Sequence, residues 1–251
     1  GAQYVHTFDK CFFMPSDLTA GLEYNRDRLK DNMWGYNRHT DQTVNIYSAF
    51  LQNEWKNDRW GILIGGRLDK HNMVDNVIFS PRANLRFNPT QNINLRLSYS
   101  SGFRAPQAFD EDMHIENVGG TVAMIERAKD LKEEKSQSFS ASADMYHRFG
   151  AFQTNLLIEG FYTRLTDVFV LGEPYDRGDG ILVKTRSNGP GAKVMGLTLE
   201  GKVAYLSILQ IQAGLTLQRS RYDEPHKWHD DAPAEKKIFR TPDTYGYFTA
   251  T

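Results

Sequence analysis

The sequence has little of what identifies several large classes of protein. Its 251 residues include one cysteine, Cys11, so there is no internal disulfide and no thiol pair for zinc or redox chemistry. Basic and acidic residues are balanced, at 30 and 31, so we expect no nucleic-acid partner, which requires a basic excess. No apolar run approaches the ~20 residues of a transmembrane helix. A membrane β-barrel is still compatible, because lipid-facing and lumen-facing side chains alternate along its strands.

Motifs that carry enzyme chemistry are also absent from the sequence. It contains no G-x-S-x-G, no G-x-x-x-x-G-K-[ST] and no H-E-x-x-H, and no nucleophile with a matching base can be assigned. We therefore expect no enzymatic activity, no cofactor and no catalytic metal.

The strongest positive signal is the alternation of apolar and polar residues with a period of two. It runs through 79–88, 93–100 and 209–218, and similar alternation covers 60–69, 138–145 and 197–205. A period of two is typical of strands with one apolar face. Counting the less regular segments, we expect about eleven antiparallel strands.

The gaps between these strands are alternately short and long. The short ones are 15–17, 56–59, 89–92, 148–151 and a turn near Leu206; the long, polar ones are 27–43, 71–78, 104–135, 166–193 and 222–242. An up-and-down membrane barrel has short turns at one end and long loops at the other, whereas a soluble sandwich has no reason to sort its loops by length. Aromatic residues near both ends of the strands predict two interfacial girdles.

The polar face of the predicted strands indicates a wide barrel. It carries arginine, aspartate, glutamate and lysine side chains that could not be buried dry without partners, so the interior is expected to hold water or an inserted polar domain. Eleven strands do not close a bacterial barrel, which uses an even number. The predicted fold class is therefore all-β: part of an antiparallel up-and-down transmembrane β-barrel, covering residues 1–251.

Two short motifs extend this interpretation from a fold to a family. Ser100–Pro106 reads SSGFRAP, and Asp130–Ser136, which opens the next strand, reads DLKEEKS. The pair resembles the S-x-G-F-R-A-P and N-L-K-P-E-x-S motifs of TonB-dependent outer-membrane receptors. Glu133 replaces the usual Pro and Asp130 the frequent Asn. The general residue pattern of the chain is similar to that of receptors from Bacteroidetes.

The resemblance implies a 22-stranded barrel, of which this chain would be about half, with the N-terminal plug domain and the C-terminal strands absent. It implies an active-transport receptor in the bacterial outer membrane that takes up a scarce ligand, such as a ferric siderophore, haem or cobalamin. The implied partners are the TonB complex, acting through the plug, the plug itself, outer-membrane lipid and a small-molecule ligand such as an iron chelate.

Two other functions are compatible with the same strand pattern. A passive porin-like channel would share the architecture and conduct ions without a plug. A soluble all-β carbohydrate-binding protein would bury its apolar faces against one another.

Candidate ligand-binding residues lie in the long loops. Asp110, Asp112 and His114 form a carboxylate cluster with one imidazole, which suits an oxygen-ligated cation or, through His114, a haem iron; haem receptors of the family often place a His between the two motifs. The alternative is a solvated acidic loop. Trp228, between two histidines, suits ligand stacking, with an ordinary surface position as the alternative.

Four arginines are candidates for contact with a plug. Arg82, Arg86 and Arg96 lie on the polar face, where they would meet a plug or simply form a solvated basic strip. Arg104, in the Phe103–Pro106 turn, could bond the plug or an acidic ligand; the alternative is that this turn only directs the loop, because Pro106 restricts the residue before it to extended geometry.

Overall fold

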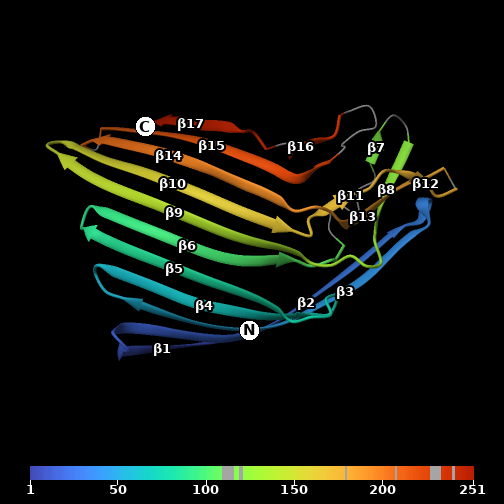
Figure 1. Ribbon diagram of the computed structural model, residues 1–251, viewed down its shortest axis with the longest axis horizontal. Helices are drawn as coiled ribbons and strands as arrows, with labels where there is room; N and C mark the ends of the chain where they lie inside the picture. The colour runs from blue at the N-terminus through green and yellow to red at the C-terminus, as the bar shows by residue number, and fades with distance from the viewer. Residues whose placement is uncertain (109–115, 119–120, 179, 207, 227–232, 239–240) are drawn as a thin grey trace.

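The computed structural model describes residues 1–108, 116–118, 121–178, 180–206, 208–226, 233–238 and 241–251, and contains one large and one small β-sheet (Figure 1). In this part of the chain the one helical segment is the 3-10 turn η1 (Trp34–Tyr36). No helix there is long and apolar enough to cross a membrane.

The large sheet has twelve strands, in the order β1-β2-β3-β4-β5-β6-β9-β10-β14-β15-β16, with β17 also paired to β15. Its strands are β1 (Ala2–Cys11), β2 (Met14–Met33), β3 (Arg38–Lys56), β4 (Trp60–His71), β5 (Ile78–Thr90), β6 (Ile93–Arg104), β9 (Glu134–Phe149), β10 (Phe152–Thr166), β14 (Ala192–Tyr205), β15 (Leu209–His226), β16 (Glu235–Lys237) and β17 (Thr244–Ala250). Because all neighbours are antiparallel, the predicted up-and-down topology is confirmed.

The strand register keeps the apolar and polar residues on separate faces. Leu85 lies opposite Ile62 and Leu97 on one face, while Arg86 lies opposite Arg96 on the other. Hydroxyl pairs such as Ser98 and Ser140, whose oxygens are 2.8 Å apart, join strands on the polar face. Directly opposed pairs of this kind stabilise a sheet and fix its register.

The apolar face is uncovered. Leu97 is 54% exposed, Leu215 43% and Leu95 37%, and in the described part of the chain no second layer packs on them. A soluble sandwich would bury these side chains, so the structure does not support that alternative.

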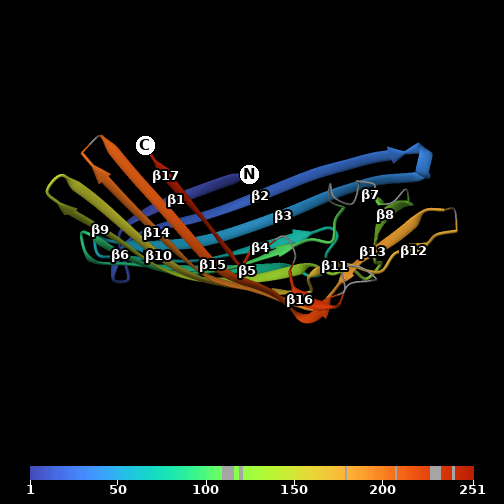
Figure 2. The same ribbon diagram turned by 90° about the horizontal axis from the view of Figure 1, so that it is seen from above.

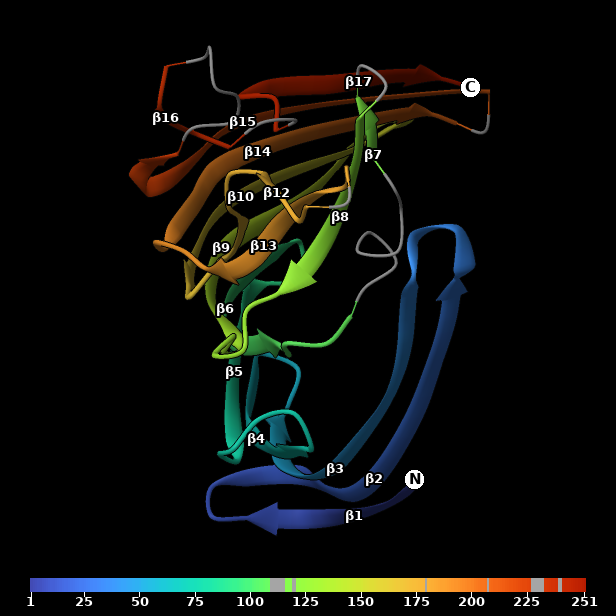
Figure 3. The same ribbon diagram turned by 90° about the vertical axis from the view of Figure 1, so that its right-hand side faces the viewer.

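The large sheet is curved but open. Figure 3 shows it bent like a letter C, with the small sheet inside the curve, and the end strands β1 and β17 do not pair with each other. Figures 1 and 2 show the short turns at one end of the molecule, with the small sheet and the tip of the β2–β3 hairpin at the other. The predicted sorting of short and long connections is thus confirmed.

Two rows of aromatic rings mark the ends of the strands, as the girdle prediction requires. Contacts near the short turns are Trp60–Phe87 (4.2 Å between centroids), Phe149–Phe152 (5.5 Å) and Phe152–Tyr205 (4.9 Å); nearer the long connections they are Tyr24–Tyr47 (4.9 Å) and Tyr99–Phe139 (4.7 Å). On β9 the rows are separated by ten residues, ~34 Å along the strand. With a ~45° tilt this is ~24 Å along the membrane normal, which matches the ~25 Å apolar band of outer-membrane barrels.

One predicted loop is in fact a hairpin. Segment 27–43, expected to be a loop, continues β2 to Met33 and starts β3 at Arg38, with Asn37 in the left-handed region (φ 49°). Polar residues occupy both faces of most of this extension, so the alternation that identifies a strand is lost while the backbone ladder continues. Arg28 forms a two-bonded ion pair with Asp41 across it, which holds the pKa of that carboxyl below its usual range.

Two more predicted loops form the small sheet. It contains β7 (Glu116–Val118), β8 (Thr121–Arg127), β11 (Phe169–Leu171), β12 (Tyr175–Asp176) and β13 (Leu182–Asn188), with β8 parallel to β13. The strands come from the β6–β9 and β10–β14 connections. Met124 and Val183 face each other in register and are fully buried, so the two connections fold as one unit.

Candidate functional site

After β6 the chain crosses the inside of the curved sheet as a short strap, residues 105–108. The Ala108 amide donates to Gln42 Oε1 on β3 (2.9 Å), and Gln107 Oε1 lies 3.3 Å from His71 Nε2 on β4. Ala105 is buried in a cluster with Val74 and Ile78, which Phe103 extends. The Phe103–Pro106 turn therefore directs the following residues toward β3 and β4.

His71 anchors this strap. The side chain is completely buried, and its Nδ1 accepts the Met73 amide at 3.0 Å. Its partner on β3 is Ile46, one residue beyond the Tyr47–Lys70 pair at the aromatic row, so it lies outside the membrane-spanning part of β4. Burial lowers the pKa of the imidazole, against the raising effects of Gln107 and Asp69.

Arg127 connects the small sheet to the same strap. Its Nη1 donates to Gln42 Oε1 (2.7 Å) and to the Pro106 carbonyl (2.9 Å). Gln42 is buried and so accepts bonds from both the strap and β8. Together these contacts fix the position of the small sheet relative to the hairpin of β2 and β3.

A polar hollow of about 670 Å³ opens between these elements. Its walls are the β2–β3 hairpin, the strap, the end of β8 and the residues after it, and Arg177 of the β12–β13 turn. Its charged and imidazole side chains are Arg38, His39, Glu126, Arg127, Lys129 and Arg177. We call it the basic hollow, because four cations and one carboxylate are among the lining residues that the structure describes.

The charges of the basic hollow suit an anionic ligand. Among its described lining residues four side chains are cations and one, Glu126, is a carboxylate, which lies 4.0 Å from Arg177. Arginine and lysine donate strong charge-assisted hydrogen bonds to carboxylate, catecholate or phosphate oxygens. His39 is oriented by Asn32 Oδ1 (3.0 Å) and by the Trp34 ring (4.8 Å).

Sequence analysis missed the hollow, and with it Trp34. This indole is 78% exposed at the hairpin tip, where it could stack on an aromatic ligand. An exposed Trp in a polar stretch was a usable signal, but only the hairpin brings it against His39, which lines the hollow.

The wall of the lumen carries a second polar cluster, on β2, β3 and β4. Arg67 donates to Glu23 (2.9 Å), Asp69 (2.8 Å) and Ser48 (2.7 Å), and Ser48 donates to Asp69 (2.6 Å). Asp69 is nearly buried, whereas about a third of the Arg67 and Glu23 side chains is exposed. The cluster satisfies its own hydrogen bonds, so it is primarily structural.

Three of the arginines predicted to face the lumen share one face of β5 and β6. Arg82 is exposed; Arg86 donates to the Asn57 and Trp60 carbonyls (3.0 and 3.3 Å), which fastens a short turn; Arg96 donates to Asn94 (2.7 Å). The register places them on the polar face, opposite to Leu85 and Leu97. Their contact with a plug stays a prediction.

Arg104 lies apart from these three, because eight residues, ~27 Å of strand, separate it from Arg96. It pairs in register with Glu134, and its guanidinium lies 5.5 Å above the centroid of the Phe169 ring. The two sequence motifs are therefore neighbours on adjacent strands. Glu134 also accepts the Phe169 amide (2.9 Å), which connects the second motif to the small sheet.

The remaining candidates, Asp110, Asp112, His114 and Trp228, lie outside the described residues. In the described ranges no group of three or more His, Cys, Asp or Glu could hold a metal ion.

Comparison with known proteins identifies the family. The family of TonB dependent receptor-like β-barrels matches residues 2–251. The chain belongs to this family. The TonB-dependent receptors are transport receptors of the outer membrane, not enzymes. No curated protein matches the chain.

Solved receptors share the fold. The siderophore receptor PirA from Pseudomonas aeruginosa superimposes with a TM-score of 0.74 at 17% identity, over 88% of this chain and 42% of its own. The ferric enterobactin receptor PfeA from the same organism, solved with enterobactin, gives 0.65 at 16%, over 99% and 45%. The FrpB iron transporter from Neisseria meningitidis gives 0.58 at 15%, over 92% and 36%. The chain thus spans less than half the length of these receptors, and at such identities the likeness shows the fold alone.

Proposed function

We propose that this chain is part of an outer-membrane receptor that captures an anionic iron chelate in the basic hollow and imports it with TonB-coupled energy. The proposal rests on the composition of the hollow. Its described lining includes four cationic side chains and one carboxylate, and it lies at the end of the barrel where the long connections gather. Solved receptors of the same fold are named as siderophore receptors and an iron transporter, which supports an iron chelate as ligand.

In this proposal residues 1–251 form part of the barrel domain, and the plug and the remaining strands are supplied from outside them. Arg82, Arg86, Arg96 and Arg104 then face the plug across the lumen, and Asp110, Asp112, His114 and Trp228 belong to outer loops that add ligand contacts. The coverage of the solved receptors, less than half of each, supports this division.

Binding of two ferric chelates by the full-length receptor tests the ligand. We expect the double substitution Lys129→Gln with Arg177→Gln to weaken binding of a trianionic ferric catecholate by roughly tenfold to a hundredfold, because two charge-assisted bonds are lost. A neutral ferric hydroxamate should bind equally to both proteins. The matched control is Arg148→Gln, an exposed cation beside a short turn at the other end of the molecule. Equal loss for both chelates, or the same loss in the control, contradicts the proposal.

Uptake of radioactive iron tests the energy coupling. Import should stop when the proton gradient is collapsed, while surface binding continues. Import that continues, together with ion conductance in planar bilayers, would favour the porin-like alternative.

A further inference from the structure

One buried oxygen joins the strap to the basic hollow. Gln42 on β3 is buried, and its Oε1 accepts the Ala108 amide of the strap (2.9 Å) and Nη1 of Arg127 on β8 (2.7 Å). A side-chain amide oxygen has two lone pairs, so these two donors match its capacity. Losing either contact would leave a buried acceptor short of a partner, which is costly. The strap and Arg127 are therefore held by the same atom.

Arg127 is also held by the strap itself. Its Nη1 donates to the Pro106 carbonyl at 2.9 Å, and the residue lines the basic hollow. The two bonds from Nη1 restrict the orientation of the guanidinium while the strap is packed. A side chain that is already ordered loses less conformational entropy when it binds a ligand. Packing of the strap therefore prepares Arg127 for an anion in the hollow.

Other groups that attach the strap are walls of the same hollow. Pro106, Ala108 and Met73 line it. The Met73 amide donates to His71 Nδ1 (3.0 Å), and the Nε2 of that ring lies 3.3 Å from Gln107 Oε1 of the strap. Detachment of the strap would therefore remove part of the wall of the hollow at the same time as it released the guanidinium.

We infer that Gln42 is a positioning residue that couples anion binding in the basic hollow to packing of the strap. While the strap is packed, Gln42 and the Pro106 carbonyl hold Arg127 where it can donate to an anion with several charged oxygens. A bound anion restrains Arg127 in return and so stabilises the packed strap. Such coupling is reciprocal, because each event favours the other by the same factor. The inference rests on the proposed function, which assigns the hollow to an anion.

Hydrogen exchange at the Ala108 amide of the full-length receptor, in detergent micelles, measures packing of the strap. We expect a ferric tris-catecholate at saturation to slow this exchange roughly tenfold. Pyrophosphate, an anion without iron or aromatic rings, should slow it as well, because the coupling depends on charged oxygens. A neutral ferric hydroxamate should leave it unchanged.

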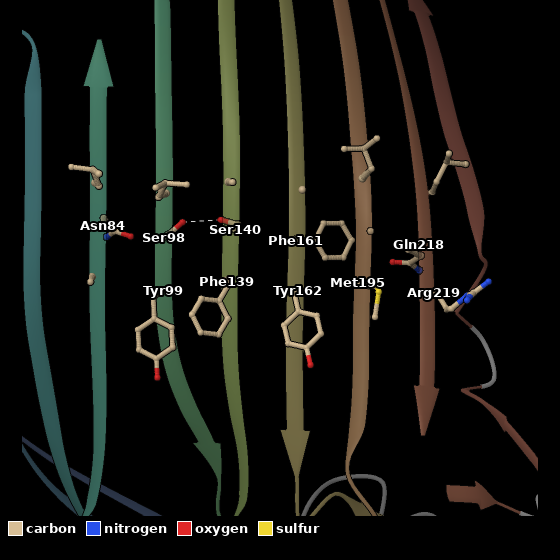
Figure 4. A pocket seen from close by; sticks show the side chains of 18 of the residues that line it. Asn84, Ser98, Tyr99, Phe139, Ser140, Phe161, Tyr162, Met195, Gln218 and Arg219 are labelled. Carbon is tan, nitrogen blue, oxygen red and sulfur yellow. Dashed lines mark hydrogen bonds between the residues drawn. The ribbon is translucent and has the colours of Figure 1, made fainter. Parts of the chain in front are cut away.

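The barrel wall supplies the internal reference for this measurement. Figure 4 shows Phe139, Tyr162 and Met195 as neighbours on β9, β10 and β14, and β10 pairs with both other strands along its length. A ligand that only stabilised the whole protein would slow exchange in 158–164 of β10 as well as at Ala108. We expect the anion to leave this segment unchanged, because the strap contacts β3, β4 and β8.

Two substitutions of Gln42 separate its contacts. Gln42→Met has a similar length but no amide oxygen, so the strap should detach more often, and the anion should no longer slow exchange at Ala108. The affinity of this variant for the anion should fall by the factor that the anion produces in the wild-type exchange, because coupling is reciprocal. Gln42→Glu keeps acceptor oxygens for Ala108, so the strap stays packed, but its carboxylate pairs with Arg127 and weakens anion binding.

The matched control is Gln153→Met, at an exposed position beside a short turn, which should change neither the exchange at Ala108 nor the affinity. If Gln42→Met fails to fold, the effect of the anion on wild-type exchange and the affinity of Gln42→Glu decide. Full anion affinity in either Gln42 variant overturns the inference.

Binding of the ferric chelate and exchange at Ala108, measured in the same samples, separate the two proposals. Chelate binding with unchanged exchange at Ala108, or with equal slowing in 158–164, overturns the coupling and leaves the proposed function standing. Slower exchange with pyrophosphate, but no chelate binding, refutes the proposed ligand and leaves the coupling standing. Absence of binding by both anions overturns both proposals.

Discussion

At the residue scale, the molecule depends on a few buried polar side chains that accept bonds from distant segments. Gln42 receives donors from residues 66 and 85 positions away along the chain. His71 joins the end of β4 to the strap and the β4–β5 connection. Such groups are expensive to bury without partners, so each of them fixes the path of the segment that satisfies it.

We expect the strap to loosen in acid. Burial lowers the pKa of His71 in the folded protein, whereas an unfolded histidine titrates near ~6.5. Above that pH the imidazole is neutral whether the strap is packed on it or detached, and the packed form keeps its full stability. As pH falls below ~6.5, the exposed imidazole of the detached form binds a proton, whereas the buried imidazole of the packed form does not. The packed form therefore loses stability relative to the detached form. Hydrogen exchange at the amides of Ala105, Gln107 and Ala108, corrected for intrinsic rates, should accelerate between pH 7.5 and 5.

His71→Gln, which cannot titrate, should remove this pH dependence. His147→Gln, at an exposed position near a short turn, should preserve it. An unchanged pH response in His71→Gln would assign the effect to other groups.

At the element scale, the small sheet shows that two long connections act as one unit. The parallel pairing of β8 with β13 joins the β6–β9 and β10–β14 connections. The second sequence motif reaches this sheet through the Lys132 amide, which donates to Asn188 (2.8 Å). The basic hollow takes Met124–Arg127 from β8, so its shape depends on this pairing.

The substitution Val183→Asp should unfold the small sheet and leave the barrel wall intact. Val183 is fully buried against Met124, and burying an unpaired polar group costs roughly 3 kcal/mol. Hydrogen exchange should show lost protection in 121–127 and 182–188, together with weaker chelate binding.

The matched control is Val77→Asp, because Val77 is 56% exposed in another connection. Lost protection in the β5–β6 pair, or an equal effect of the control, would contradict the independence of the two sheets.

At the scale of the whole molecule, the separation of an apolar face from a polar face determines what each side of the large sheet contacts. The polar face carries its own hydrogen bonds, and the uncovered face is apolar between two aromatic rows. Large uncovered apolar surfaces on soluble proteins are rare and mark contact with lipid or protein. The full-length receptor should therefore require detergent and migrate differently on gels before and after heating.

Placing a charge on each face tests this orientation. Leu97→Arg, on the outward face two residues inside the Tyr99–Phe139 row, should destabilise the folded barrel by about 1–2 kcal/mol, because arginine is costly in the apolar band and less so toward its edges. Ser98→Arg, the next residue on the lumen face, should cost much less, since water solvates the new charge. Urea unfolding in lipid vesicles, followed by the gel shift, measures both; equal costs would contradict the assigned faces.

The sequence by itself determined the strands of the barrel wall, their faces, the sorting of the connections and the family. All of these follow from local pattern: alternation repeats every two residues, turns have characteristic residues, and the two motifs are contiguous. The faces of Arg82, Arg86 and Arg96 were predictable for the same reason.

Only the tertiary structure decided the hairpin extension, the small sheet and the basic hollow. Their segments contact water on most sides, so no periodicity marks them, and their contacts join residues far apart in the chain. Arg127 meets Gln42, and β8 meets β13, because the curved sheet brings their connections to one end of the barrel. The proposed ligand binding in the basic hollow depends on these connections meeting at one end of the sheet, which no local sequence pattern encodes.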